Sequence, residues 1–110
     1  MHDIILDCDP GHDDAMAIVL AVGNPGINLI GVTTVGGNQS LDKVTYNARS
    51  VLEATGATTI PVHAGCDRPL VRPLGVAASI HGQSGLDGVE LPKPSRPLDP
   101  GHAVNWIVDT

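Results

Sequence analysis

Residues 4–22 read IILDCDPGHDDAMAIVLAV, and this stretch predicts a strand, a tight turn and a helix in succession. The apolar residues at its start predict a buried strand over residues 4–7, which delivers Asp7 and Asp9 at its carboxyl end. A Pro-Gly pair then predicts a tight turn. The apolar run that follows predicts a buried helix over residues 14–22. Four carboxylates therefore gather at one strand–turn–helix junction.

This concentration of negative charge is costly without compensation. Two carboxylates ~4 Å apart in a medium of effective dielectric ~20 repel each other by about 4 kcal/mol. Asp13 could be a helix N-cap and Asp14 could favour the positive end of the helix dipole, but these roles leave Asp7 and Asp9 unexplained. A bound cation would relieve the repulsion, so the junction is a candidate metal or catalytic site.

The rest of the chain continues the alternation of strand and helix up to Gly65. Apolar and β-branched residues predict strands, and apolar positions at helical spacing predict helices, the second of which Ser40 can cap. Pro and Gly are frequent beyond Gly65, which predicts a long irregular region. The further predicted elements are strands over residues 28–35 and 60–64, and helices over residues 41–55 and 102–110.

Such alternation is typical of an α/β fold with a mostly parallel sheet and helices on both faces. Right-handed crossovers place the carboxyl ends of all strands along one edge of the sheet, where ligands bind in open α/β folds. Asp9, Asn38 and the loop after Ala64 fall at that edge. The sequence therefore predicts that these segments meet.

Composition excludes several classes of protein. The 110 residues are 42% hydrophobic and 16% charged, which indicates a globular domain rather than a disordered chain. Net charge is −6 without a basic patch, which argues against nucleic-acid binding. The longest apolar run, residues 15–22, is far too short to span a membrane. Cys8 and Cys66 lack the paired spacing of a zinc or redox site, and with no secretory signal visible we expect a cytoplasmic protein.

The sequence resembles the inosine–uridine-preferring nucleoside hydrolases over essentially its whole length. The most specific motif is DCDPGHDDAMAI at residues 7–18. Further similar segments are TTVGGN at 33–38, NA at 47–48, PVHAGC at 61–66, HGQSG at 81–85 and HAV at 102–104.

The resemblance implies an enzyme that hydrolyses the N-glycosidic bond of ribonucleosides to free base and ribose. It implies a calcium ion held by Asp9 and Asp14, with Asp9 also acting as general base toward water. Asp13, Asn38 and His81 would contact the substrate, and Asp7 would support the metal ligands from behind. It further implies a cytoplasmic homo-oligomer that acts in purine and pyrimidine salvage.

The chemistry of these residue types agrees with those roles. Calcium takes six to eight oxygen ligands, and metal coordination acidifies water. Hydrolysis at an anomeric carbon passes through an oxocarbenium-like state that carboxylates stabilise. Members of the family are roughly three times as long, and their later strands supply further metal and substrate ligands. We therefore expect residues 1–110 to be the N-terminal part of a single nucleoside hydrolase domain, inactive in isolation.

Two alternatives stay open from the sequence alone. Asp7-Cys8-Asp9 after an apolar strand also resembles the Asp-x-Asp motif of haloacid-dehalogenase-type phosphatases, which use magnesium. The other alternative is a non-catalytic fragment that binds a cation.

Overall fold

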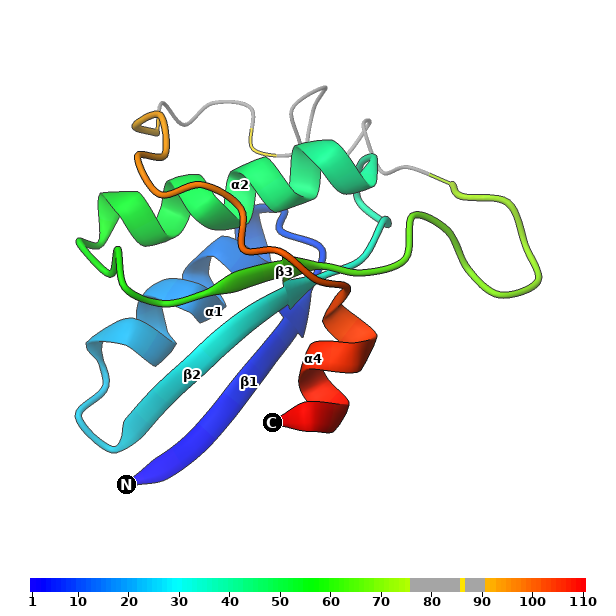
Figure 1. Cartoon of the computed structure of the whole chain (residues 1–110). Helices are drawn as coiled ribbons and strands as arrows, with labels where there is room; N and C mark the ends of the chain where they lie inside the picture. Colours follow the sequence, from blue (N-terminus) through cyan, green and yellow to red (C-terminus); the bar gives the residue numbers. More distant parts are fainter. Residues whose placement is uncertain (76–85, 87–90) are drawn as a thin grey trace.

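Strands and helices alternate along the chain in the computed structural model, which describes residues 1–75, 86 and 91–110 (Figure 1). The predicted alternation is confirmed, with ends that differ by one to a few residues and a shorter third strand. The elements are β1 His2–Cys8, α1 His12–Gly23, β2 Ile27–Thr34, α2 Leu41–Ala54, β3 Val62–Ala64 and α4 Ala103–Asp109.

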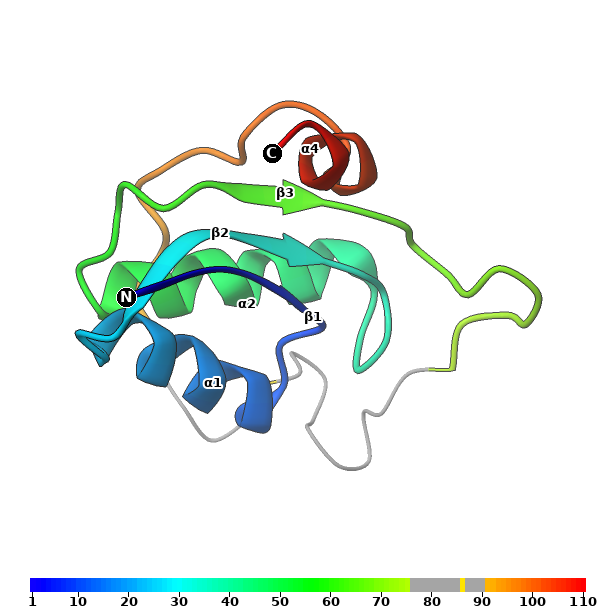
Figure 2. The same ribbon diagram turned by 90° about the horizontal axis from the view of Figure 1, so that it is seen from below.

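The three strands form a parallel sheet in the order β1-β2-β3. Asp7 is paired with Thr33, and Thr33 with His63, so the carboxyl ends of all three strands lie at the same edge. Helices α1 and α2 cover one face of this sheet and α4 lies on the other (Figure 2). The predicted α/β class, with a parallel sheet and helices on both faces, is confirmed.

The core lies between the sheet and the layer formed by α1 and α2. The predicted apolar face of α2 packs there, with Val44, Ala48, Val51 and Leu52 buried. Ile18 of α1 is fully buried against it. The sheet contributes Cys8, Leu29, Val32 and Val62.

Two predictions of burial were wrong. Strand β1 was expected to be buried, but residues 4–6 are only half-buried and Asp7 is exposed. The reason is that β1 lies at an end of the described sheet and has a partner strand on one side. Helix α1 was also expected to be buried, yet Met16 and Leu20 are 68% and 65% exposed. Among the described residues, α1 packs against α2 and β2, and Ile18 and Ala21 are its buried residues.

The helix ends differ from the predicted caps. Gly11, not Asp13, is the N-cap of α1 and has no side chain to contribute. Ser40 occupies the N-cap position of α2 as predicted, but its hydroxyl makes no capping hydrogen bond. In α4 the side chain of His102 accepts a hydrogen bond from the backbone N–H of Val104. Caps depend on local backbone angles that residue type does not fix.

Helix α4 rests on the sheet through an aromatic contact. The indole of Trp106 covers Gly31 of β2 so closely that a Cβ at that position would overlap it. The same indole stacks on the ring of His63, with centroids 4.7 Å apart and planes inclined by 17°. Glycine is required at position 31 because of this close approach, not because of an unusual backbone angle.

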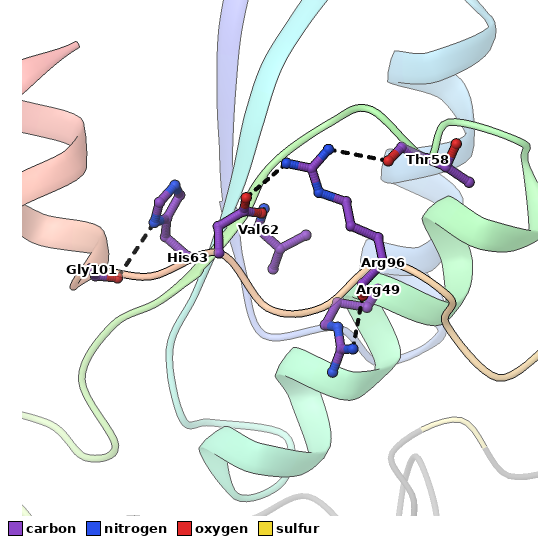
Figure 3. Close-up of polar contacts among 7 residues, drawn as sticks. Arg49, Thr58, Val62, His63, Arg96 and Gly101 are labelled. Atoms are coloured by element: carbon purple, nitrogen blue, oxygen red, sulfur yellow. Dashed lines mark hydrogen bonds and ion pairs between the residues drawn. The ribbon is translucent and has the colours of Figure 1, made fainter.

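The segment that leads into α4 is tied to the start of β3 by Arg96 and Asp99 (Figure 3). Asp99 Oδ2 accepts from the backbone N–H of Val62 at 2.8 Å, and Asp99 Oδ1 pairs with the Arg96 guanidinium at 2.7 Å. Arg96 also donates to the carbonyl of Thr58 at 3.2 Å, while its own carbonyl accepts from Arg49 at 2.9 Å. None of the helices in the described residues has the length and apolar character needed to cross a membrane.

Candidate active site

The loops after the three strands meet at the carboxyl edge of the sheet, as the sequence predicts. The backbone N–H of Val35, just after β2, donates to the carbonyl of Cys8 at 3.1 Å. The N–H of Gly36 donates to the carbonyl of Cys66, in the loop after β3, at 2.9 Å. These bonds continue the pairing of the strands into the loops, so the polar side chains that follow are held on short, restrained segments.

Asp9 and Asn38 are the most tightly joined pair at this edge. The backbone N–H of Asn38 donates to Asp9 Oδ2 at 3.0 Å, and the Asn38 side-chain amide donates to the Asp9 carbonyl at 2.7 Å. Gly37 makes this approach possible, because a Cβ on Gly37 would overlap the Asp9 carboxylate. The loop after β2 thus fixes both the backbone and the carboxylate of Asp9.

Asp14, in the first turn of α1, is the second carboxylate at the turn. Its Oδ2 accepts from the backbone N–H of Asp9 at 3.1 Å. Burial, followed by contact with the Asp9 carboxyl and the charge of Asp13, raises the pKa of Asp14 to about 6. A group in this setting gains from a nearby cation, which would restore its preference for the charged form.

Asp7 and Asp13, the other two acids of the motif, have different surroundings. Asp7 Oδ1 accepts from the hydroxyl of Thr33 at 2.6 Å. Thr33 is two residues from Gly31, so this pair lies on the face of the sheet that α4 covers. Asp13 is exposed in the first turn of α1, where its charge is favoured by the helix dipole. The structure thus brings together Asp9, Asp14 and Asn38, and places Asp7 apart from them.

Cys8 lies in the middle of the four acids and stays a neutral thiol. Burial raises its pKa well above the ordinary value, and the charges of Asp14, Asp7 and Asp9 raise it further. Its Sγ points toward the Thr33 carbonyl at 3.8 Å. Cys8 therefore packs in the core as a small apolar group.

His81, predicted to contact the substrate, lies outside the described residues. Within the described residues, no group of three or more His, Cys, Asp or Glu side chains is arranged to hold a metal ion. Asp9 and Asp14 supply two carboxylates of the kind that a hard cation prefers. They fit calcium as part of a coordination shell rather than as a complete one.

Two residues that contact the turn, Asn47 and Gly37, were not assigned a role from the sequence. Asn47 of α2 is buried and donates from Nδ2 to the Pro10 carbonyl at 3.2 Å. A polar residue within the apolar stripe of α2, three positions after Val44, is a signal that could have revealed it. Gly37 had no comparable signal, since a glycine in a turn does not show what approaches it.

Comparison with known proteins identifies the family. The sequence model described as inosine-uridine preferring nucleoside hydrolase matches residues 4–110. The chain belongs to this family. A curated nucleoside hydrolase of this type from Crithidia fasciculata is 55% identical over 107 residues, covering 96% of the chain and 34% of the relative. A pyrimidine-specific ribonucleoside hydrolase from Escherichia coli K12 is 48% identical, covering 97% of the chain and 34% of the relative.

The fold agrees with this assignment to the nucleoside hydrolase family. The solved structure of a purine-preferring ribonucleoside hydrolase from Gardnerella vaginalis superposes with a TM-score of 0.91 at 33% identity, covering 98% of the chain and 35% of that protein. The chain spans about a third of the length of the curated relatives it matches. Membership of the family decides between the two enzyme classes that the sequence leaves open, in favour of nucleoside hydrolase over phosphatase. Nucleoside hydrolases are generally metal-dependent.

Proposed function

We propose that the chain forms the N-terminal part of one nucleoside hydrolase domain, which cleaves the N-glycosidic bond of ribonucleosides to free base and ribose. One observation carries the proposal. Asp9, Asp14 and Asn38 come from three separate segments and are held together at the carboxyl edge of a parallel sheet. This is the edge where α/β folds bind ligands. The names of the relatives support the same reaction class.

In this proposal Asp9 is the general base. Its carboxylate is half-buried and fixed by the N–H of Asn38, so it can accept a proton from water without first being ordered. As the bond to the base breaks, positive charge develops on the ribose ring, and the nearby carboxylates stabilise it. The negative charge gathered at the turn thus serves both proton transfer and charge stabilisation.

Asp9 and Asp14 would also hold a calcium ion in the complete site. The raised pKa of Asp14, and the hydrogen bond that its carboxylate accepts from the Asp9 N–H, support this assignment, because a cation would stabilise the two charged groups. When bound, the ion supplies Lewis acidity toward water and affinity for vicinal hydroxyls. Asp7, through Thr33, would steady the end of β1 behind these ligands.

Substrate contacts in the proposal come from Asp13, Asn38 and His81. Asp13 is an exposed acceptor beside the metal ligands, suited to a ribose hydroxyl. Asn38 is held by its two bonds to Asp9, so its position is defined before substrate arrives. The proposal further includes a homo-oligomeric complete enzyme that acts in purine and pyrimidine salvage in the cytoplasm.

A chimera tests the proposal. Residues 1–110 would replace the matching segment of the Crithidia fasciculata relative, and release of ribose from inosine and uridine would be measured with calcium present. We expect hydrolysis of at least one of the two nucleosides. The matched control is Asp3→Asn, since Asp3 lies at the opposite end of β1, where its carboxylate accepts a hydrogen bond from the Asn28 side-chain amide. A folded chimera that releases no ribose, while the control relative is active, would refute the proposal.

A further inference from the structure

The buried Asn47 reaches from α2 to the turn that carries the acidic residues. It lies among the apolar positions of the helix, and its Nδ2 donates to the Pro10 carbonyl at 3.2 Å, across 37 positions of sequence. Burying an amide is costly unless it is hydrogen-bonded. A polar residue kept at this position therefore serves the contact that it makes.

The acceptor of this bond, the Pro10 carbonyl, lies in the turn between β1 and α1. Pro10 is fully buried and stands directly between Asp9 and Gly11. The carbonyl of Gly11 accepts a hydrogen bond from the N–H of Ala15 at the start of α1. The carbonyl of Pro10 belongs to the residue just before Gly11. A buried carbonyl requires a donor. Asn47 supplies it from a neighbouring element.

The bond adds a restraint that the other contacts of the turn lack. Asn38 holds Asp9 from the side of β2, and Asp14 holds its backbone N–H from the side of α1. Asn47 holds the carbonyl of Pro10, the next residue, from the middle of α2. Loss of this bond would free the Pro10–Gly11 peptide, which joins Asp9 to the helix that carries Asp14.

We propose that Asn47 is a positioning residue, which fixes the turn so that Asp9 and Asp14 face a cation together. This inference rests on the proposed function for the identity of the ligand. It assigns no contact between Asn47 and cation or substrate. Its effect on the turn passes through the Pro10 carbonyl, in the way that a residue behind a metal site orients the ligands of that site.

Calcium titration of the 110-residue chain by calorimetry gives the first test. Asn47→Leu keeps the size of the side chain and removes the donor, and we expect the affinity for calcium to fall by about 10-fold or more, the usual scale for such supporting residues. The matched control is Thr45→Val, which removes the buried hydroxyl pair between Thr45 and Thr34, 2.7 Å apart, on the same helix. We expect it to destabilise the chain comparably but to keep the affinity within about 2-fold.

Amide hydrogen exchange without calcium gives a second and independent test. In Asn47→Leu, and in the milder Asn47→Ser, we expect faster exchange at the N–H groups of Asp9 and Asn38 than in Thr45→Val of equal stability. Equal exchange at these two amides in Asn47 and Thr45 variants would overturn the inference, as would unchanged calcium affinity. A wild-type chain that binds no calcium would count against the metal assignment in the proposed function, while exchange would still decide the role of Asn47.

Discussion

Two groups of carboxylates in this molecule have opposite surroundings. At the end of β1, Asp14 is held beside Asp9 and Asp13, and its pKa is raised to about 6. At the start of β3, burial alone would raise the pKa of Asp99, but the hydrogen bonds from Arg96 and from the N–H of Val62 outweigh it and lower the pKa. The surroundings of Asp14 disfavour its charged form, whereas Arg96 and the N–H of Val62 favour the charged form of Asp99.

This difference suggests that the Arg96–Asp99 pair stabilises the fold and that the Asp9–Asp14 turn serves function. The Arg96–Asp99 pair joins the segment before α4 to β3 and needs nothing further to be satisfied. The Asp9–Asp14 turn has its backbone well bonded, but it holds two carboxylates side by side, and the neighbouring carboxyl groups help to raise the pKa of Asp14. Clusters of like charge that a fold keeps in place are typical of functional sites. Substitutions at the two places should therefore have opposite effects on the stability of the calcium-free chain.

The largest effect is expected from Asp9→Asn in the chimera with the Crithidia fasciculata relative. An amide cannot take the proton of water, so kcat should fall by about 10²–10⁴, the usual scale for loss of a general base. Steady-state hydrolysis of inosine and uridine measures it. Asp3→Asn, at the other end of β1, should keep kcat. A kcat near that of the unmodified chimera would remove Asp9 from its assigned role.

Gly37→Ala should disturb the same carboxylate without changing any charge. The new methyl group would overlap Asp9, so the carboxylate must turn away from Asn38 and Asp14. We expect calcium affinity of the chain to fall by about 10-fold, measured by calorimetry. Gly23→Ala is the control, because a Cβ there meets open space. Equal affinities in the two variants would show that the close packing of Gly37 does not matter.

Asp14→Asn should stabilise the chain in calcium-free buffer at pH 7. It removes a charge from beside Asp9 and Asp13, while the amide oxygen can still accept from the Asp9 N–H. We expect a gain of about 1 kcal/mol in the free energy of unfolding, well below the full Coulomb value because these groups are partly solvated. Urea denaturation measures it. Added calcium should stabilise the wild type more than the variant. If Asp14→Asn instead lowers the stability in calcium-free buffer, repulsion among these carboxylates is not the dominant effect at the turn.

Asp99→Asn should have the smallest effect and the opposite sign. Loss of the ion pair with Arg96 should lower the free energy of unfolding by about 0.5–1 kcal/mol at pH 7. Because the pKa of Asp99 is lower in the folded state, its contribution is present above the ordinary carboxyl pKa of about 3.9 and is lost as the pH falls below it. The gap between wild type and variant should therefore close as the pH falls below about 4. A gap independent of pH would exclude the ion pair as its cause.

The sequence predicted the parts of this fold that depend on local pattern. Period and residue type placed all three strands and the three helices, and chain topology placed Asp9 beside Asn38. Burial was predicted less well, because the apolar residues of α1 and β1 do not show how many elements will pack on them. Met16 and Leu20 remain exposed for this reason.

The finer geometry of the site depends on contacts between distant residues. The bond from Asn47 to Pro10 spans 37 positions, and the overlap that requires glycine at 37 involves a carboxylate 28 positions away. Neither follows from local pattern. Asp7 was expected to support the metal ligands from behind. It accepts a hydrogen bond from Thr33, its register partner on β2, and its supporting role stays a prediction.

The most direct test of the central claim compares uridine and 2′-deoxyuridine as substrates of the chimera. If Asp9, Asp13, Asp14 and Asn38 form a site for a cation and a ribose, removal of the 2′-hydroxyl leaves polar groups of the site unpaired. We then expect kcat/KM for uridine to exceed that for 2′-deoxyuridine by about 10²-fold or more. Equal kcat/KM values for the two nucleosides would contradict a ribose-binding site at this turn.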